Sequence, residues 1–318
     1  MITFGTLFSG IGAPEQALKS LGIPHQLTYA CDFDPAVKTT FLYNYKCQHF
    51  YDDVTKISHL PYTDILVFGS PCQAFSYAGH RRGLGDSRGR LLYTTLDLIA
   101  ETLPRVVVME NVVGLATYEN GSLLKDIIGR FEKMGYVVSY AILNGVDYGI
   151  PQHRERLFVV ATHFKFQFPA PTAKQSSLKR FIFPVSSPEL VTRHFLSKPK
   201  VQRKLYGWKH DYMPCLTHTL SRRGSSSEFI SCVAATHKAT GQLRSPTVDE
   251  VRRLFGFPAT FNFPDDISTT KRLNMFTNSM VVPVVAAILN PLVSALSCEF
   301  YIKNKKLVDC NKSLCYYS

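Results

Sequence analysis

The sequence predicts an α/β fold: a doubly wound, mainly parallel sheet with a smaller, irregular second domain. Two observations lead to this prediction. Through residues 1–164, short apolar runs rich in β-branched side chains alternate with helical patterns, which is typical of a sheet covered by helices on both faces. After His163 the periodicity weakens into Ser-, Pro- and Lys-rich sequence, which indicates a separate unit.

The predicted elements alternate along the chain. Period-two or continuous apolar runs indicate strands, and apolar side chains at helical spacing indicate helices. The expected strands are 2–8, 27–31, 65–69, 106–109, 137–143 and 158–161, with a short one before Asp52. The expected helices are 15–21, 37–45, 91–103 and 123–134. Thr247 and Glu250 have capping-box spacing, so another helix should begin there.

Four segments follow from these patterns. Residues 1–164 form the sheet domain, 165–245 an irregular domain, 246–300 a segment that returns to the sheet domain, and 301–318 a basic tail. The apolar stretch 280–296 is interrupted by polar residues and prolines. We therefore expect a buried helix there rather than a membrane span.

Composition excludes several classes of protein. With 318 residues and 45% hydrophobic side chains, the chain can build a substantial core and is not a disordered tail. The N-terminus lacks a charged-then-apolar leader, and the eight cysteines lack paired metal-ligand spacing. We expect an intracellular protein that is not secreted and holds no metal.

Positive charge is concentrated in one segment. The formal net charge is +12, yet residues 1–164 carry 14 Lys and Arg against 15 Asp and Glu. Residues 165–245 carry 14 basic side chains against 3 acidic ones. Such an imbalance attracts a polyanion, so nucleic acid is the expected partner; a solvated basic surface is the alternative.

Cys72 follows the predicted strand 65–69, at the edge of the sheet where ligands bind in open α/β folds. Pro71 restricts the backbone that leads to it. The basic, glycine-containing stretch 79–90 would favour the reactive thiolate. Cys72 is therefore a candidate nucleophile; an inert buried cysteine is the alternative.

Polar groups follow the other strands as well. The Phe8–Gly12 turn allows close backbone approach to a ligand, and Asp32 and Asp53 follow the next two strands, which suggests a nucleoside-bearing cofactor. Solvated turn carboxylates are the alternative. Glu110 ends an apolar run that should raise its pKa, so it can donate a proton. The stretch 152–156 carries alternating arginines, for which an exposed charged edge is the alternative.

In combination these motifs resemble the cytosine-C5 DNA methyltransferases over nearly the full length. The matching stretches, in order and spacing, are 8–12, 32–34, Asp53, 69–76, 86–89, 110–112, 152–156, 253–258 and 278–283. The resemblance implies a Rossmann-like class I methyltransferase that uses S-adenosyl-L-methionine. Residues 165–245 then correspond to the target-recognition domain, and 1–164 to the catalytic and cofactor-binding domain.

The resemblance also implies residue roles. The catalytic residues would be Cys72, which attacks C6 of a flipped cytosine, and Glu110, which acts at N3. Arg156 and Arg154 would hold the base and its carbonyl oxygen or help orient the neighbouring groups. The cofactor residues would be Phe8, Gly10, Ile11, Gly12, Asp32, Phe33, Asp53, Val54, Gly69, Pro71, Leu91 and Asn278. The DNA-binding residues would be Gln73, Ser76, Arg81, Arg82, Arg88, Thr219, Arg222 and Arg223.

The expected function is thus sequence-specific DNA (cytosine-5-)-methylation, by a monomer acting on double-stranded DNA, with a cognate restriction endonuclease as a possible partner. Thr277 stands where the family usually has glycine, and its side chain would crowd the methionine moiety of the cofactor. Two rival functions stay open. One is a tRNA cytosine-C5 methyltransferase, although the Cys-Phe-Thr element of that branch is absent. The other is a non-catalytic DNA-binding regulator on the same scaffold.

Overall fold

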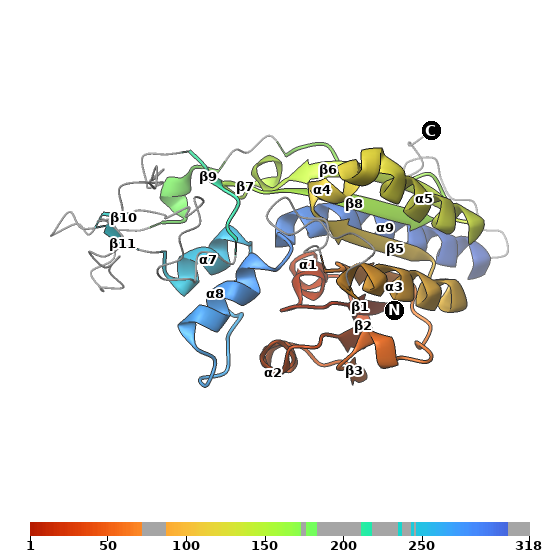
Figure 1. The fold of residues 1–318 in the computed structure, drawn as a ribbon, viewed down its shortest axis with the longest axis horizontal. Helices are drawn as coiled ribbons and strands as arrows, with labels where there is room; N and C mark the ends of the chain where they lie inside the picture. Colours follow the sequence, from red (N-terminus) through yellow and green to blue (C-terminus); the bar gives the residue numbers. More distant parts are fainter. Residues whose placement is uncertain are drawn as a thin grey trace.

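A seven-stranded, mainly parallel sheet forms the centre of the computed structural model (Figure 1). The structure describes residues 1–71, 87–172, 176–182, 211–217, 235–236, 243–244 and 246–304. Strand order in the sheet is β3-β2-β1-β4-β5-β8-β6. The strands β1 to β5 pair in parallel, whereas β8 is antiparallel to both β5 and β6. This arrangement confirms the predicted doubly wound, mainly parallel fold.

The sheet strands are β1 (Ile2–Leu7), β2 (His25–Cys31), β3 (His49–Tyr51), β4 (Ile65–Phe68), β5 (Val106–Asn111), β6 (Val137–Asn144) and β8 (Glu155–Thr162). The helices are α1 (Ala13–Ser20), α2 (Pro35–Asn44), α3 (Ser87–Thr102), α4 (Val113–Thr117), α5 (Ser122–Lys133), α7 (Val248–Leu254), α8 (Thr269–Thr277) and α9 (Val282–Asn304). Two further short pairs are formed by β7 (Gln152–His153) with β9 (Met213–Pro214), and by β10 (Ala235–Thr236) with β11 (Leu243–Arg244).

Helices cover both faces of the sheet because its central strands are apolar on both sides. In β5, Val106 and Val108 face the core that contains α1 and α9, whereas Val107 and Met109 face the core beneath α3 and α5. Side chains alternate across a strand, so a continuous apolar run such as 106–109 must be buried on two faces. Within the described residues no single helix is long and apolar enough to cross a membrane. The helix α8 and the first part of α9 reach the required length and hydropathy only when taken together, and they are bent by 43° relative to each other.

Chain order reverses between β1 and β4. From β1 the chain moves outward to β2 and β3, then returns to β4 on the other side of β1. The connections after β1 and β4 therefore lead in opposite directions, and ligands of open α/β sheets bind at the carboxyl ends of the strands beside such a reversal. The Phe8–Gly12 turn follows β1, and Gly69 follows β4.

Most predicted elements are confirmed, including the capping box. Thr247 Oγ1 accepts a hydrogen bond from the Glu250 amide, and Glu250 Oε2 accepts one from the Thr247 amide. The helix α9 continues through Asn304, past the expected start of the tail at 301, because residues 292–304 contain neither proline nor glycine to end it. Beyond the expected boundary at 164, Phe166 packs into the core and accepts a hydrogen bond from Ser139 Oγ at 2.8 Å.

Candidate active site at the carboxyl edge of the sheet

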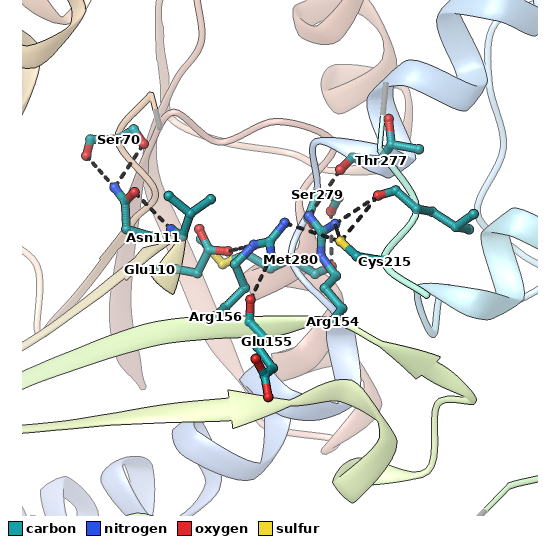
Figure 2. Close-up of polar contacts among 12 residues, drawn as sticks. Ser70, Glu110, Asn111, Arg154, Glu155, Arg156, Cys215, Thr277, Ser279 and Met280 are labelled. Carbon is teal, nitrogen blue, oxygen red and sulfur yellow. Dashed lines mark hydrogen bonds and ion pairs between the residues drawn. The ribbon is translucent and has the colours of Figure 1, made fainter. Parts of the chain in front are cut away.

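Glu110 and Arg156 form an ion pair at the centre of this edge (Figure 2). Glu110 lies near the end of β5 and Arg156 near the start of the antiparallel strand β8, so hydrogen bonding between the two strands brings them together. The Nε atom of Arg156 is 3.2 Å from Oε1 of Glu110, and their side chains are only 18% and 14% exposed. Burial raises the pKa of Glu110 although both neighbouring arginines oppose the shift.

Gly69 lies directly against this pair, at the end of β4. A Cβ atom at position 69 would stand 3.0 Å from the Met280 Cε atom and 3.3 Å from Glu110 Oε2. A side chain there would displace either the carboxylate or the methionine. Glycine at position 69 therefore lets Met280 and Glu110 approach the backbone closely.

Ser70 and Asn111 fix the loop that leads from β4 toward Cys72. The Asn111 Nδ2 atom donates hydrogen bonds to the Ser70 carbonyl at 3.2 Å and to Ser70 Oγ at 3.0 Å (Figure 2). Both side chains are buried, so these bonds are shielded from competition with water. These hydrogen bonds fix the backbone just before the segment that contains Cys72. Cys72 itself lies outside the described residues.

Arg154 is buried, and its guanidinium is bound to the backbone. Its Nη2 donates to the carbonyls of Thr277 at 3.0 Å and Ser279 at 2.9 Å, and its Nη1 donates to that of Leu216 at 3.1 Å. Only 4% of the residue is exposed. Its guanidinium thus links the turn before β8 to the end of α8 and to residues 215–216 (Figure 2).

Cys215 is a site residue that the sequence analysis missed. Its Sγ atom accepts hydrogen bonds from Arg154 Nη1 at 3.3 Å and from Arg156 Nη2 at 3.8 Å. Burial alone would raise the pKa of this thiol, but the two guanidinium groups outweigh it and lower the pKa. Cys215 lies one residue after the two-residue strand β9, which is too short to leave a periodic pattern in the sequence. The only indication that this region belongs to the site was its proximity in sequence to the expected DNA-binding residue Thr219.

The turn after β1 forms an open cradle. Gly10 and Gly12 have φ values of +54° and +78°, and Phe8, which is not glycine, has +53°. A Cβ atom on Gly10 would meet nothing within 4 Å, whereas one on Gly12 would collide with the Tyr45 ring. The Gly10 amide donates to Asp32 Oδ2 at 2.9 Å, which joins the turn to the end of β2. Gly10 therefore leaves space at its surface for a ligand.

The acids beside this cradle differ in environment. Burial raises the pKa of Asp32, although hydrogen bonds from the Asp34 and Gly10 amides oppose the shift. Asp53 accepts two hydrogen bonds from Thr55, which lower its pKa, so it stays ionised. Phe33, between them in the sequence, is 80% exposed and offers a free aromatic face.

The remaining expected cofactor residues divide by burial. Ile11 and Val54 are core side chains, with 0% and 4% exposure, so only their backbone is available to a ligand. Pro71 and Leu91 are half-buried, and Asn278 is exposed at the end of α8. Thr277 is buried, and its Oγ1 donates to the Asn274 carbonyl at 3.0 Å, within its own helix.

Seven of the eight expected DNA-binding residues lie outside the residues that the structure describes. These are Gln73, Ser76, Arg81, Arg82, Thr219, Arg222 and Arg223. Arg88 lies on α3, but its side chain belongs to the undescribed part.

This sheet order, with a glycine-containing first turn and acids at the strand ends, defines a Rossmann-like methyltransferase fold. Residues 2–294 match the family described as C-5 cytosine-specific DNA methylase, so the chain belongs to that family. It is a DNA (cytosine-5-)-methyltransferase with S-adenosyl-L-methionine as methyl donor, which confirms the predicted activity and cofactor.

Individual relatives agree with this assignment. The chain is 30% identical to the Type II methyltransferase M.HaeII of Haemophilus aegyptius, over 92% of each chain. It is 31% identical to the Type II methyltransferase M.DsaV of Dactylococcopsis salina, over 97% of this chain and 90% of the relative. The crystal structure of S. pombe Dnmt2 methyltransferase has the same fold, with a TM-score of 0.76, 21% identity and coverage of 93% of this chain and 99% of that one.

The residues present fit S-adenosyl-L-methionine. Gly10 offers an uncrowded backbone surface, Asp32 offers a carboxylate for ribose hydroxyl groups, and Phe33 offers an exposed aromatic face for a nucleobase. All three lie at the end of β1 or β2, beside the reversal of strand order.

Proposed function

We propose that the protein methylates cytosine within a short specific sequence of double-stranded DNA, through covalent addition of Cys72 to a base flipped out of the helix. The observation that best supports this proposal is the buried Glu110–Arg156 pair. It places an acid with a raised pKa next to Gly69, three residues before the expected nucleophile. A binding protein would need neither a buried acid nor a thiol at this point.

The Glu110–Arg156 pair supplies the proton donor that activation of cytosine requires. C5 is a weak nucleophile, so a bond from the Cys72 thiolate to C6 must first push electrons into the ring. Glu110, in its protonated form, donates to N3 and stabilises the charge that develops there. After C5 has gained the methyl group, the C5 proton leaves, the C6–S bond breaks and the electron pair returns to sulfur.

Arg156 orients Glu110 in this scheme. Its guanidinium holds one carboxyl oxygen through Nε, which leaves the other oxygen, Oε2, to face the base. Its Nη1 donates to the Glu155 carbonyl at 2.7 Å and its Nη2 donates to Cys215 Sγ at 3.8 Å. Each of these nitrogens carries a second N–H group, a directional donor suited to the carbonyl oxygen of cytosine. We assign Arg154 a positioning role, because both of its terminal nitrogens donate to backbone carbonyls.

Binding of the cofactor is assigned to the cradle after β1. Asp32 would hold the ribose, Asp53 the adenine amino group, and Phe8 and Phe33 the adenine faces, with Gly69, Pro71, Leu91 and Asn278 completing the wall. When bound, S-adenosyl-L-methionine supplies an electrophilic methyl group on a sulfonium. The backbone of Gly10, Ile11, Gly12 and Val54 would line the rest of the pocket.

DNA binding is assigned to the basic segment 165–245 and to the stretch 79–90. Arginines there would neutralise phosphates, which makes affinity strongly dependent on salt concentration. Extruding the target base costs a few kcal/mol and exposes its edges to Glu110. The Type II names of the relatives favour a cognate restriction endonuclease as partner, and we expect the methyltransferase to act as a monomer.

Two measurements test this proposal. Cytosine-resolved methylation sequencing of unmethylated DNA should show 5-methylcytosine in one short sequence with the wild type and none with Cys72→Ser. DNA carrying 5-fluorocytosine at that position should form a covalent complex, because fluorine cannot leave C5 as the proton does. Methylation without trapping would contradict the covalent route, and methylation of tRNA alone would contradict the DNA substrate.

A further inference from the structure

Cys215 is placed where it can act on both arginines of the active site. Its segment, residues 211–217, is attached to the catalytic edge by pairing of β9 with β7 and by a hydrogen bond from the Leu216 amide to Gln152 Oε1 at 3.0 Å. The segment is therefore fixed, and Sγ lies 3.3 Å from Arg154 Nη1 and 3.8 Å from Arg156 Nη2. Figure 2 shows both guanidinium groups pointing toward this sulfur.

Positive charge is concentrated at this point. Arg154 and Arg156 bring two guanidinium groups to a mostly buried region, in which Glu110 is the carboxylate paired with Arg156. When Glu110 carries a proton during the reaction, its charge no longer offsets these guanidinium groups. A thiolate at position 215, within hydrogen-bond distance of both, would offset part of their charge.

The alternative is a neutral thiol. Sγ also lies 3.7 Å from the Leu216 carbonyl, to which an S–H group would donate. This contact is long and weak compared with the 3.1 Å hydrogen bond that the same carbonyl accepts from Arg154 Nη1. Two charged donors directed at the sulfur favour the anion over one weak bond from the thiol.

We propose that Cys215 is a positioning residue for methyl transfer: as a thiolate it holds Arg154 and Arg156 and offsets their charge, so that Glu110 remains protonated while paired with Arg156. This inference rests on the proposed function. It also gives the recognition segment a direct contact with the groups that control the catalytic acid. The protein thus has a second activated cysteine, distinct from the expected nucleophile.

Thiol chemistry tests the ionisation independently of methylation. The full-length Cys72→Ser protein is treated with iodoacetamide at a series of pH values, and alkylation of each cysteine peptide is followed by mass spectrometry. Because only the thiolate reacts, the rate at Cys215 should reach half its maximum at least about one pH unit below that of half-buried Cys47. A midpoint at or above the ordinary value of about 8.5 would overturn the inference.

Kinetics test the effect on Glu110. Loss of the thiolate should lower the pKa of Glu110, so Cys215→Ser should move the alkaline limb of the kcat profile down by about one pH unit and reduce kcat about tenfold at neutral pH. Cys215→Asp, which restores an anion, should return the limb toward its wild-type position. Cys47→Ser, which changes another half-buried thiol, should leave the profile unmoved. A lower kcat with an unmoved limb would show a merely structural role and contradict the inference.

The two experiments separate this inference from the proposed function. If the wild type fails to methylate DNA, the proposed function is wrong, while alkylation of Cys215 still reports its charge. If DNA is methylated but Cys215 titrates as an ordinary thiol, the proposed function stands and the inference is wrong.

Discussion

Arg156 Nε lies 3.2 Å from Glu110 Oε1, across the antiparallel pairing of β8 with β5. The antiparallel direction of β8 matters, because it brings the start of one strand beside the end of another. A parallel strand in this place would put its own start at the opposite edge of the sheet. The position of Arg156 is thus a consequence of the one strand direction that departs from the parallel pattern.

Glu110→Gln tests the acid directly. An amide cannot give up a proton to N3, so kcat should fall about 100- to 10,000-fold while affinity for DNA and cofactor is retained. In the wild type, burial raises the pKa of Glu110, so the active protonated form should persist to higher pH than in an ordinary glutamate and be lost as pH rises through that pKa. Steady-state kinetics across pH measure both effects; a Gln variant with wild-type kcat would contradict the assignment.

The two arginines should respond differently to replacement by lysine. Arg154→Lys removes several buried hydrogen bonds and should lower the free energy of unfolding by about 3 kcal/mol. Arg156→Lys should mainly lower kcat, because an ammonium group cannot match the geometry of the guanidinium toward Glu110. Urea unfolding and single-turnover kinetics of both variants separate the roles. Equal losses of stability would contradict the division.

Much of this site could be predicted from the sequence, because its residues stand directly at strand ends. Glu110 follows an apolar run, and the Phe8–Gly12 turn follows another, so the sheet alone brings them to one edge. The role of Cys215 in the site could not be predicted from the sequence. Its position depends on the pairing of the two-residue strands β9 and β7, which are too short to leave a periodic pattern. The surroundings of Arg154 could not be predicted for a related reason: a basic side chain in sequence does not reveal the three backbone carbonyls around it.

Alanine substitutions at Gly10 and Gly12 should have different effects, one on cofactor binding and the other on the stability of the fold. Gly12→Ala would push a Cβ atom into the Tyr45 ring and should lower the free energy of unfolding by about 3 kcal/mol. Gly10→Ala meets no protein atom, so left-handed strain alone should cost about 1 kcal/mol. The added methyl group would instead occupy the ligand surface and weaken binding of S-adenosylhomocysteine, measured by calorimetry. Unchanged binding by Gly10→Ala would show that the cradle is not the cofactor site.

Glu15 gives the fold a dependence on pH. This side chain of α1 is 1% exposed, its Oε1 accepts a hydrogen bond from Thr6 Oγ1 at 2.7 Å, and its Oε2 has no hydrogen-bond partner among the described residues. Burial raises its pKa to about 7. The protonated side chain therefore stabilises the folded state fully below the pKa of an unfolded glutamate, and this contribution is lost as pH rises through about 7.

Glu15→Gln should remove that dependence, because an amide keeps the acceptor for Thr6 without ionising. From pH 5 to pH 9 the free energy of unfolding of the wild type should fall by about 2.5 kcal/mol more than that of the variant. Glu119→Gln, on an exposed turn, is the matched control and should follow the wild type. Parallel curves for the wild type and Glu15→Gln would mean that Glu15 ionises as readily in the folded protein as in the unfolded chain.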